Sequence, residues 1–208
     1  MESIDGIVYI NLATRIDRKE EIEKQLQKVL NPEDLLKVHR LEAIRNLENP
    51  CLGCVQSHCA ATQLALDNNW TTVLILEDDF VWEDFVTREL LQERLSSFWK
   101  NHMHAFGFVQ VGHGRLYKST PISDTLHFVE NSCNAVAYIV HHRAMQPLID
   151  IYTSTFKLFT DKSQHWLYQN DIVWNKIRDV HPCYAFEPRL AYQSGGFSDL
   201  SCCILEPR

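Results

Sequence analysis

The sequence predicts a single α/β domain over residues 1–208, with a mixed, mostly parallel central sheet flanked by helices. Strand-like apolar runs alternate along the chain with segments whose apolar residues recur at helical spacing, as in strands connected by helices. A length of 208 residues suits one domain, and no repeat, charge block or linker-like stretch divides the chain. We therefore expect one core built around one sheet.

The first part of the chain predicts a strand, a helix and a second strand. Residues 6–12 (GIVYINL) form an apolar run typical of a strand, and apolar residues then recur at helical spacing over 22–30. Asn31-Pro32 closes that helix, and a short strand is expected near 37–44. The first two segments make a β-α unit.

The next helix and strand have clearer start signals. Asn49 is a favoured capping residue and proline suits the first helical position, so we expect a helix from Pro50 to Leu66. Residues 71–76 (TTVLIL) form a short, almost wholly apolar and β-branched run. This pattern is typical of a strand covered on both faces, so we place it in the middle of the sheet.

The remaining elements are predicted from the same two periodicities. We expect, in order, a helix over 85–98, central strands over 105–111 and 134–140, a helix near 143–152, a helix capped by Asn170, and short strands and loops in the last thirty residues. Strands and helices thus keep alternating, which supports the predicted fold class.

The charge balance excludes some classes of partner. Lys and Arg number 20 and Asp and Glu number 27, and the net charge of −7 has the wrong sign for binding nucleic acid through its phosphates. The first five residues lack the basic start of a signal peptide, and no apolar run reaches the roughly 18 residues of a membrane span. We therefore expect a cytoplasmic protein in which a small anion is bound by a local basic group, a helix N-terminus or a bridging metal.

The cysteines are expected to be reduced thiols. They number seven, an odd set, and a cytosolic compartment keeps thiols reduced. Cys51 and Cys54 form a single CxxC pair, whereas a structural zinc site needs a second pair or suitably spaced histidines, which Cys202-Cys203 does not supply. We interpret the pair as small buried residues at the start of a helix.

Three consecutive carboxylates, Glu77, Asp78 and Asp79, follow the apolar strand directly. In open α/β sheets ligands bind beyond the carboxyl ends of the strands, so these acids lie where a site is expected. Strand alternation predicts that Glu77 and Asp79 converge while Asp78 turns away. Converging carboxylates suit Mn²⁺ or Mg²⁺, which accept diphosphate oxygens in the same shell. The alternative is a solvated acidic loop that caps a helix beginning near Asp84.

Five motifs occur in order along the chain. They are Ile10-Asn11-Leu12 followed by Arg15, Asp17 and Arg18; Gly53-Cys54 with Ser57-His58; Leu74 to Asp79 (LILEDD); Ala135 to Ala144; and Pro188, Gln193 and Ser198-Asp199-Leu200. In these motifs the chain resembles glycosyltransferase family 25, which contains lipooligosaccharide galactosyltransferases and the procollagen galactosyltransferase domain. The resemblance covers about residues 6 to 200.

The resemblance implies a GT-A-type, Rossmann-like fold and metal-dependent, inverting transfer of a hexose. The hexose, galactose or glucose, would pass from a UDP-sugar to a hydroxyl of a glycan or protein acceptor. A divalent cation held by Glu77 and Asp79 would neutralise the departing diphosphate as the glycosidic bond breaks. The third protein ligand is open: His181 is one candidate, and water could serve instead.

Nine residues are assigned to the donor site. Arg15 and Arg18 lie between the first strand and the first helix, where guanidinium groups could meet phosphate oxygens; the alternative is a solvated charge at the helix start. Asn11 could read the uracil or the ribose, with helix capping as its alternative. The full set is Asn11, Leu12, Arg15, Arg18, Ser57, His58, Asp78, Gln193 and Ser198, of which Ser57 and His58 rest on the family resemblance.

Inverting transfer needs a base for the acceptor hydroxyl, and a carboxylate is the usual choice. Asp171 is the first candidate because the family carries an acidic residue in this region. Its alternative is an acid at a helix N-terminus, which the helix dipole favours there. Asp199 is the second candidate base, although it could instead close the donor or metal site.

Two other function classes stay open at this level. A binding protein could keep the fold without turnover, and a metal-dependent phosphohydrolase or nucleotidyltransferase also uses carboxylates at strand ends. A lipopolysaccharide sugar, a collagen hydroxylysine and a viral or cell-surface glycan are all compatible acceptors. We expect acceptor specificity in the loops at 112–124 and 157–168.

Overall fold

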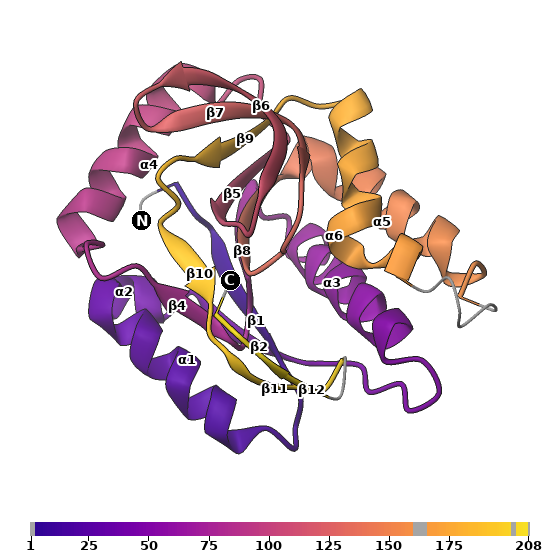
Figure 1. Cartoon of the computed structure of the whole chain (residues 1–208). Coiled ribbons are helices and arrows are strands. Elements are labelled where there is room, and N and C mark those ends of the chain that lie inside the picture. Colours follow the sequence, from indigo (N-terminus) through magenta and orange to yellow (C-terminus); the bar gives the residue numbers. More distant parts are fainter. Residues whose placement is uncertain (1–2, 160–165, 201–202, 208) are drawn as a thin grey trace.

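A mixed sheet of ten strands divides the protein, and helices cover both of its faces (Figure 1). The computed structural model describes residues 3–159, 166–200 and 203–207. The main path of the sheet runs β2-β1-β3-β8-β5-β9-β7-β6, and β10 pairs with β5 and with β4. From the pairing directions, β8, β7 and β4 run opposite to the other strands of this sheet. The predicted α/β class with a mixed, mostly parallel sheet is confirmed.

The strands and helices have the following bounds. The strands are β1 Gly6–Asn11, β2 Val38–Glu42, β3 Thr72–Glu77, β4 Phe80–Trp82, β5 Phe108–Gly112, β6 Leu116–Ser123, β7 Leu126–Ser132, β8 Ala137–His141, β9 Cys183–Phe186, β10 Ala191–Gln193, β11 Gly196–Ser198 and β12 Cys203–Leu205. The helices are α1 Ile16–Val29, α2 Pro32–Leu35, α3 Pro50–Asp67, α4 Arg88–His102, α5 His142–Phe156, α6 Asn170–Val173 and the 3₁₀ helix η2 Trp174–Asp179.

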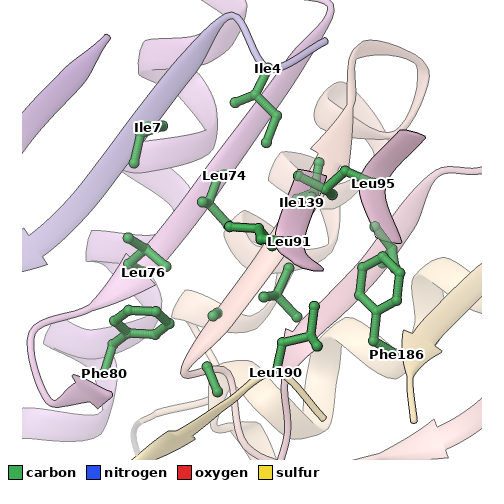
Figure 2. Packing of buried hydrophobic residues seen from close by; sticks show 14 of the residues in the cluster. Ile4, Ile7, Leu74, Leu76, Phe80, Leu91, Leu95, Ile139, Phe186 and Leu190 are labelled. Carbon is green, nitrogen blue, oxygen red and sulfur yellow. The ribbon is translucent and has the colours of Figure 1, made fainter. Parts of the chain in front are cut away.

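Strand β3 lies in the middle of the sheet, as its apolar run predicts. It pairs with β1 in parallel and with β8 in antiparallel orientation, and its side chains alternate between two hydrophobic clusters. Leu74 and Leu76 pack with residues of α1 and α4 on one face. Figure 2 shows them in one cluster with Leu91 and Leu95 of α4. Val73 and Ile75 pack with residues of α3 and α5 on the other. Burying a side chain such as Leu74 fully contributes about 1.5–3 kcal/mol, so this strand anchors both layers.

Helix α3 begins where the capping signal predicts. Asn49 accepts a hydrogen bond from the Leu52 amide at 3.2 Å, and Pro50 takes the first helical position. Helix α4 begins later than expected, at Arg88. Thr87 caps it by accepting from the Leu90 amide, and Phe85 lies before the helix with 47% of its surface exposed.

Two expectations about local structure are corrected. Asn170 is the first residue of α6, whose N-cap is Gln169, and the predicted helix there divides into α6 and η2. Residues 112–124, expected as a loop, largely form β6, which pairs with β7 in a hairpin. Most of β6 is exposed, so its sequence lacks the apolar alternation that identifies a half-buried strand. Within the other expected specificity loop, residues 160–165 lie outside the described residues.

The carboxyl ends of β1, β2 and β3 meet at one edge of the sheet because these strands are parallel neighbours. The short hairpin of β11 and β12 lies beside this edge (Figure 1). None of the helices in the described part of the chain has both the length and the apolarity of a membrane span.

Candidate functional site

A cavity of about 570 Å³ opens at the carboxyl edge of β3. Its walls come from α3, the acidic segment after β3, α6 and the chain around β11, which are distant in sequence. The sequence-predicted site residues that line it are Leu12, Arg18, Ser57, His58, Glu77, Asp78, Asp79, Asp171, Gln193, Ser198 and Asp199. Asn11, Arg15 and His181 do not line it.

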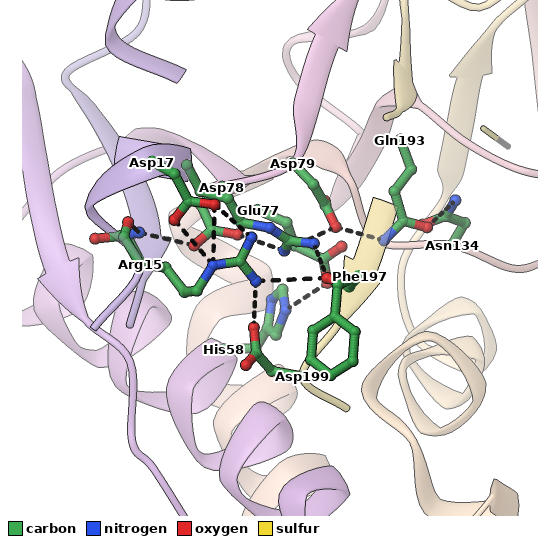
Figure 3. Close-up of polar contacts among 12 residues, drawn as sticks. Arg15, Asp17, His58, Glu77, Asp78, Asp79, Asn134, Gln193, Phe197 and Asp199 are labelled. Atoms are coloured by element: carbon green, nitrogen blue, oxygen red, sulfur yellow. Dashed lines mark hydrogen bonds and ion pairs between the residues drawn. The ribbon is translucent and has the colours of Figure 1, made fainter. Parts of the chain in front are cut away.

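The three consecutive carboxylates do not have the arrangement that strand alternation predicts (Figure 3). Glu77 Oε1 lies 3.1 Å from His58 Nε2. Arg18 Nη1 donates to both Asp78 Oδ1 at 2.9 Å and Asp79 Oδ2 at 3.2 Å. The expectation that Asp78 turns away from Asp79 is therefore wrong. Strand β3 ends at Glu77, so its alternation does not continue through the next two residues.

Asp79 is the most constrained acid of the group. Its Oδ2 accepts from Arg18 and from Gln193 Nε2, the latter at 3.0 Å, whereas its buried Oδ1 has no hydrogen-bond partner among the described residues. Burial, and then the charge of Glu77, raise the pKa of Asp79 to about 7 against the opposing effect of Arg18. The site thus holds a carboxylate oxygen that is desolvated and unpaired.

Asn11 is hydrogen-bonded to Asp78 and does not line the cavity. Its Nδ2 donates to Asp78 Oδ2 at 2.8 Å, and its Oδ1 accepts from Arg40 Nε at 3.0 Å. The side chain is 1% exposed. Both ends of its amide thus bind protein groups, and the role of Asn11 in reading uracil or ribose stays a prediction.

Arg15 and Arg18 connect the acidic edge to the C-terminal hairpin. Arg15 Nη1 lies 2.5 Å from Asp199 Oδ2, and Arg15 Nη2 lies 2.8 Å from Asp17 Oδ2. Both arginines donate to the carbonyl oxygen of Phe197, Arg18 at 2.9 Å and Arg15 at 3.4 Å (Figure 3). Their guanidinium groups are therefore engaged by carboxylates and a carbonyl, and Arg18 alone of the two lines the cavity.

Ser57 holds a loop against the start of α3. Its hydroxyl donates to the Gly53 carbonyl at 2.7 Å and accepts from the Ile44 amide at 2.8 Å. A Cβ at Gly53 would lie 2.5 Å from the Ile44 carbonyl oxygen, so only glycine allows this close approach. The Gly-Cys-x-x-Ser-His motif thus has a structural reason in its glycine and serine.

His58 faces two polar groups although it is almost completely buried. Tyr138 Oη lies 2.7 Å from Nδ1, and Glu77 Oε1 lies 3.1 Å from Nε2. Cys54, one helical turn earlier on α3, also lines the cavity. Burial raises the pKa of the Cys54 thiol well above its usual range, and the charge of Glu77 adds to this.

Asp171, the first candidate base, lies at the start of α6 on the cavity wall. Its Oδ2 accepts from the Asn134 amide at 2.9 Å. Burial, and then the nearby Glu77, raise its pKa, while the Asn134 hydrogen bond opposes this. Asn134 has a positive φ of 72° and also donates from Nδ2 to Gln193 Oε1, so it links the surroundings of Asp171 and Asp79.

His181 lies at the opposite end of the sheet from the acidic segment. The Gly107 amide, just before β5, donates to the Pro182 carbonyl, and a Cβ at Gly107 would lie 2.5 Å from His181 Cβ. Strand β5 runs in the same direction as β3, so its start is at the amino edge. The prediction of His181 as a ligand alongside Glu77 and Asp79 is wrong for this reason.

The cavity residues that sequence reasoning did not assign to the site include Cys54 and Asn134. Cys54 stands four residues before His58, a spacing that places both on one helix face, so a signal for it was present. Asn134 had no comparable local signal, because its role depends on contacts with Asp171 and Gln193.

Comparison with known proteins agrees with the fold and the family resemblance. Residues 30–163 match the family described as "Glycosyltransferase family 25 (LPS biosynthesis protein)". No curated protein matches the chain.

Three solved structures share the fold at low sequence identity. A197 from STIV has a TM-score of 0.51 and 13% identity, covering 98% of this chain and 94% of its own. Mannose-1-phosphate geranyltransferase from Thermus thermophilus has a TM-score of 0.52 and 10% identity over 88% of this chain and 73% of its own. UDP-glucose pyrophosphorylase complexed with UDP-glucose has a TM-score of 0.50 and 9% identity, covering 88% of this chain and 90% of its own.

These similarities confirm the GT-A-type architecture that the resemblance implied. The family match covers more than half of the chain and includes α3, β3 and the three carboxylates. The chain belongs to glycosyltransferase family 25.

Proposed function

We propose that this chain is a metal-dependent glycosyltransferase that moves a hexose, galactose or glucose, from a UDP-sugar to a hydroxyl of a glycan or protein acceptor with inversion. The observation that carries the proposal is the buried Oδ1 of Asp79, which lies on the wall of the cavity close to Glu77 and has no hydrogen-bond partner among the described residues. Membership of the family supports sugar transfer as the reaction class. The donor, the metal and the acceptor are the proposed parts.

The residues fit a divalent cation. An unpaired buried carboxylate oxygen costs free energy unless a cation or a donor meets it, and two further carboxylates lie in the same segment. Oxygen ligands suit Mn²⁺ and Mg²⁺. Asp79 and Glu77 would hold the ion, while Arg18 and Asn11 hold Asp78. When bound, the ion would supply positive charge that stabilises the departing diphosphate.

The donor part of the proposal rests on the cavity and on one structural neighbour. A volume of about 570 Å³ lies within the roughly 300–1,000 Å³ of small-molecule sites. UDP-glucose pyrophosphorylase, which has a similar fold, holds UDP-glucose. Gln193 orients Asp79, and Ser57 positions the loop that contributes Ile44 and its neighbours to the cavity wall.

Asp171 is the carboxylate best placed to take the proton of the acceptor hydroxyl. It lines the cavity, and its raised pKa makes it a better proton acceptor than an ordinary aspartate. Asp199 also lines the cavity but forms an ion pair with Arg15 at 2.5 Å. We therefore assign the base to Asp171 and the closing of the site to Asp199.

Thermal unfolding with UDP and Mn²⁺, separately and together, tests the proposal. A ligand that binds the native state raises the midpoint, so the combination should raise it more than either alone. Asp79→Asn should lose the effect of the combination. The proposal fails if UDP with Mn²⁺ leaves the wild-type midpoint unchanged.

Turnover assays then separate the other function classes. We expect slow release of UDP from one UDP-sugar, accelerated by the right acceptor; lipopolysaccharide saccharides come first because the family is described by LPS biosynthesis. Binding without turnover would indicate a binding protein. Hydrolysis of simple phosphate esters would indicate a phosphohydrolase.

The base assignment has its own test. Asp171→Asn keeps an oxygen that can accept from the Asn134 amide but removes the basic group. We expect kcat to fall by about 10²–10⁴-fold, with the midpoint shift caused by UDP and Mn²⁺ retained. Asp199→Asn is the matched control, and a larger kcat loss there than in Asp171→Asn would reverse the assignment.

A further inference from the structure

Three side chains of different chemistry converge on one wall of the cavity. Cys54 and His58 stand four residues apart on α3, so they occupy one helix face, and Glu77 ends the adjacent strand β3. One potential ligand atom of each, a sulfur, a ring nitrogen and a carboxylate oxygen, lies within 4.8 Å of the others. His58 Nε2 and Glu77 Oε1 are 3.1 Å apart.

This spacing is close to that of a tetrahedral metal site. Zinc binds sulfur, nitrogen and oxygen ligands at about 2.0–2.3 Å, which separates neighbouring ligand atoms by about 3.3–3.8 Å. Side-chain adjustments of about an ångström would therefore bring the three groups into coordination. Since all three line the cavity, a fourth position can face the cavity and accept water.

The neighbouring residues orient His58, and the three ligand types determine which metal the cluster suits. Tyr138 Oη lies 2.7 Å from His58 Nδ1, so the ring is held with Nε2 toward Glu77, as outer contacts hold metal-bound histidines. Asp171 and Asp79 line the same cavity as the cluster. The ligand types distinguish metals: a thiolate with an imidazole favours Zn²⁺ or Co²⁺, whereas Mn²⁺ and Mg²⁺ favour oxygen.

We propose that Cys54, His58 and Glu77 form a zinc site on the cavity wall, distinct from the oxygen ligands provided by Asp79. Glu77 belongs to both ligand sets, so Zn²⁺ on the cysteine and histidine withdraws Glu77 from the catalytic ion. Zinc therefore inhibits sugar transfer. This inhibition rests on the proposed function, whereas zinc binding itself does not.

Cobalt binding followed by absorption spectroscopy tests the site without any activity assay. Co²⁺ on a thiolate gives a near-ultraviolet charge-transfer band that oxygen ligands alone do not give. We expect one Co²⁺ per wild-type chain to produce this band, and Zn²⁺, but not Mg²⁺, to displace it. Cys54→Ser should abolish the band, while Cys59→Ser, a buried cysteine on the same helix, should retain it.

The remaining ligands are tested in the same way. His58→Gln should weaken Co²⁺ binding by more than the roughly 10–100-fold that loss of an outer-shell partner costs. Circular dichroism checks that each variant is folded. The proposal is overturned if saturating Co²⁺ gives no band in the wild type, if the band survives in folded Cys54→Ser, or if Cys51→Ser removes it instead.

The outcomes also separate this inference from the proposed function. A cobalt band without any effect of UDP and Mn²⁺ would support the zinc site and contradict the transferase proposal. A UDP effect that requires Mn²⁺, without a cobalt band, would do the reverse. With both present, Zn²⁺ should lower the rate of UDP release in the wild type and have a weaker effect in Cys54→Ser.

Discussion

The two ends of the central sheet both contain buried ionisable groups, but they differ in what those groups can do. At the carboxyl edge, burial raises the pKa of Asp79 to about 7. At the amino edge, burial lowers the pKa of His141 to about 4, and the pKa of His181 is lowered for the same reason. Loss of hydration, which disfavours the charged form, is the largest cause of each shift.

The difference lies in packing and pairing. Asp79 lines a cavity of about 570 Å³, and one of its oxygens has no hydrogen-bond partner in the part of the chain that the structure describes. His141 caps α5 by accepting from the Arg143 amide, and its ring packs edge-on against Phe106 with centroids 5.1 Å apart. His181 packs against Gly107. A shifted pKa therefore indicates a functional site only when the group also faces space for a ligand.

The largest expected effect is a loss of activity on substitution at the carboxyl edge, with no such loss on substitution at the amino edge. Asp79→Asn should lower the rate of UDP release from the preferred UDP-sugar by about 10²–10³-fold or more, because it removes a charge that would hold the catalytic ion. His181→Ala, at the other edge, should leave the rate essentially unchanged. Rates with saturating Mn²⁺ measure both variants.

The opposite result for either variant would contradict this contrast between the carboxyl edge and the amino edge. An active Asp79→Asn variant would show that the buried carboxylate is structural. An inactive but folded His181→Ala variant would show that the amino edge contributes to the reaction.

The pH dependence of stability should have opposite signs at the two edges. Between pH 3.8 and about 7, native Asp79 keeps a proton that the unfolded chain releases, so its contribution to stability falls as pH rises. Between about 4 and 6.5, unfolded His141 binds a proton that the native state does not, so its contribution rises with pH. The Asp79 effect is on the order of a few kcal/mol in metal-free protein.

Urea unfolding with a chelator present measures these effects. Relative to the wild type, Asp79→Asn should gain stability between about pH 5 and about pH 7, whereas His141→Gln should lose relative stability over the same interval. Parallel pH profiles for the wild type and Asp79→Asn would contradict the buried state of this carboxylate.

The smallest expected effect is the loss of stability when either of two closely packed glycines, Gly53 or Gly107, is replaced by alanine. A Cβ would lie 2.5 Å from the Ile44 carbonyl oxygen at Gly53 and 2.5 Å from His181 Cβ at Gly107. Alanine should cost about 1–3 kcal/mol at either position, because neither neighbour is the flexible end of a side chain. Unfolding by urea measures this cost.

The two alanine variants should differ in UDP binding. Gly53→Ala displaces the loop that carries Ile44, which lines the cavity, so the midpoint shift caused by UDP with Mn²⁺ should shrink. Gly107→Ala should retain the full shift. Equal shifts in both variants would mean that the loop does not contribute to binding.

Several features followed from the sequence because they depend on neighbouring residues. The apolar run of β3 predicted a central strand, and Asn49 with Pro50 predicted the start of α3. The polarity of a parallel sheet then placed Glu77, Asp78 and Asp79 at the edge where ligands bind. Hairpin β6–β7 was missed because most of β6 is exposed and its alternation is lost.

The sequence by itself thus determined the α/β class, the family and the position of the acidic segment. Only the tertiary structure decided which further side chains share the site: it brought Cys54 and Asn134 to the cavity at the acidic edge, placed Asn11 against Asp78, and left His181 at the other end. Periodicity and capping act over a few residues along the chain. The side-chain contacts of the site join residues up to 184 positions apart, as between Arg15 and Asp199, and such pairings depend on how the strands order themselves in the sheet.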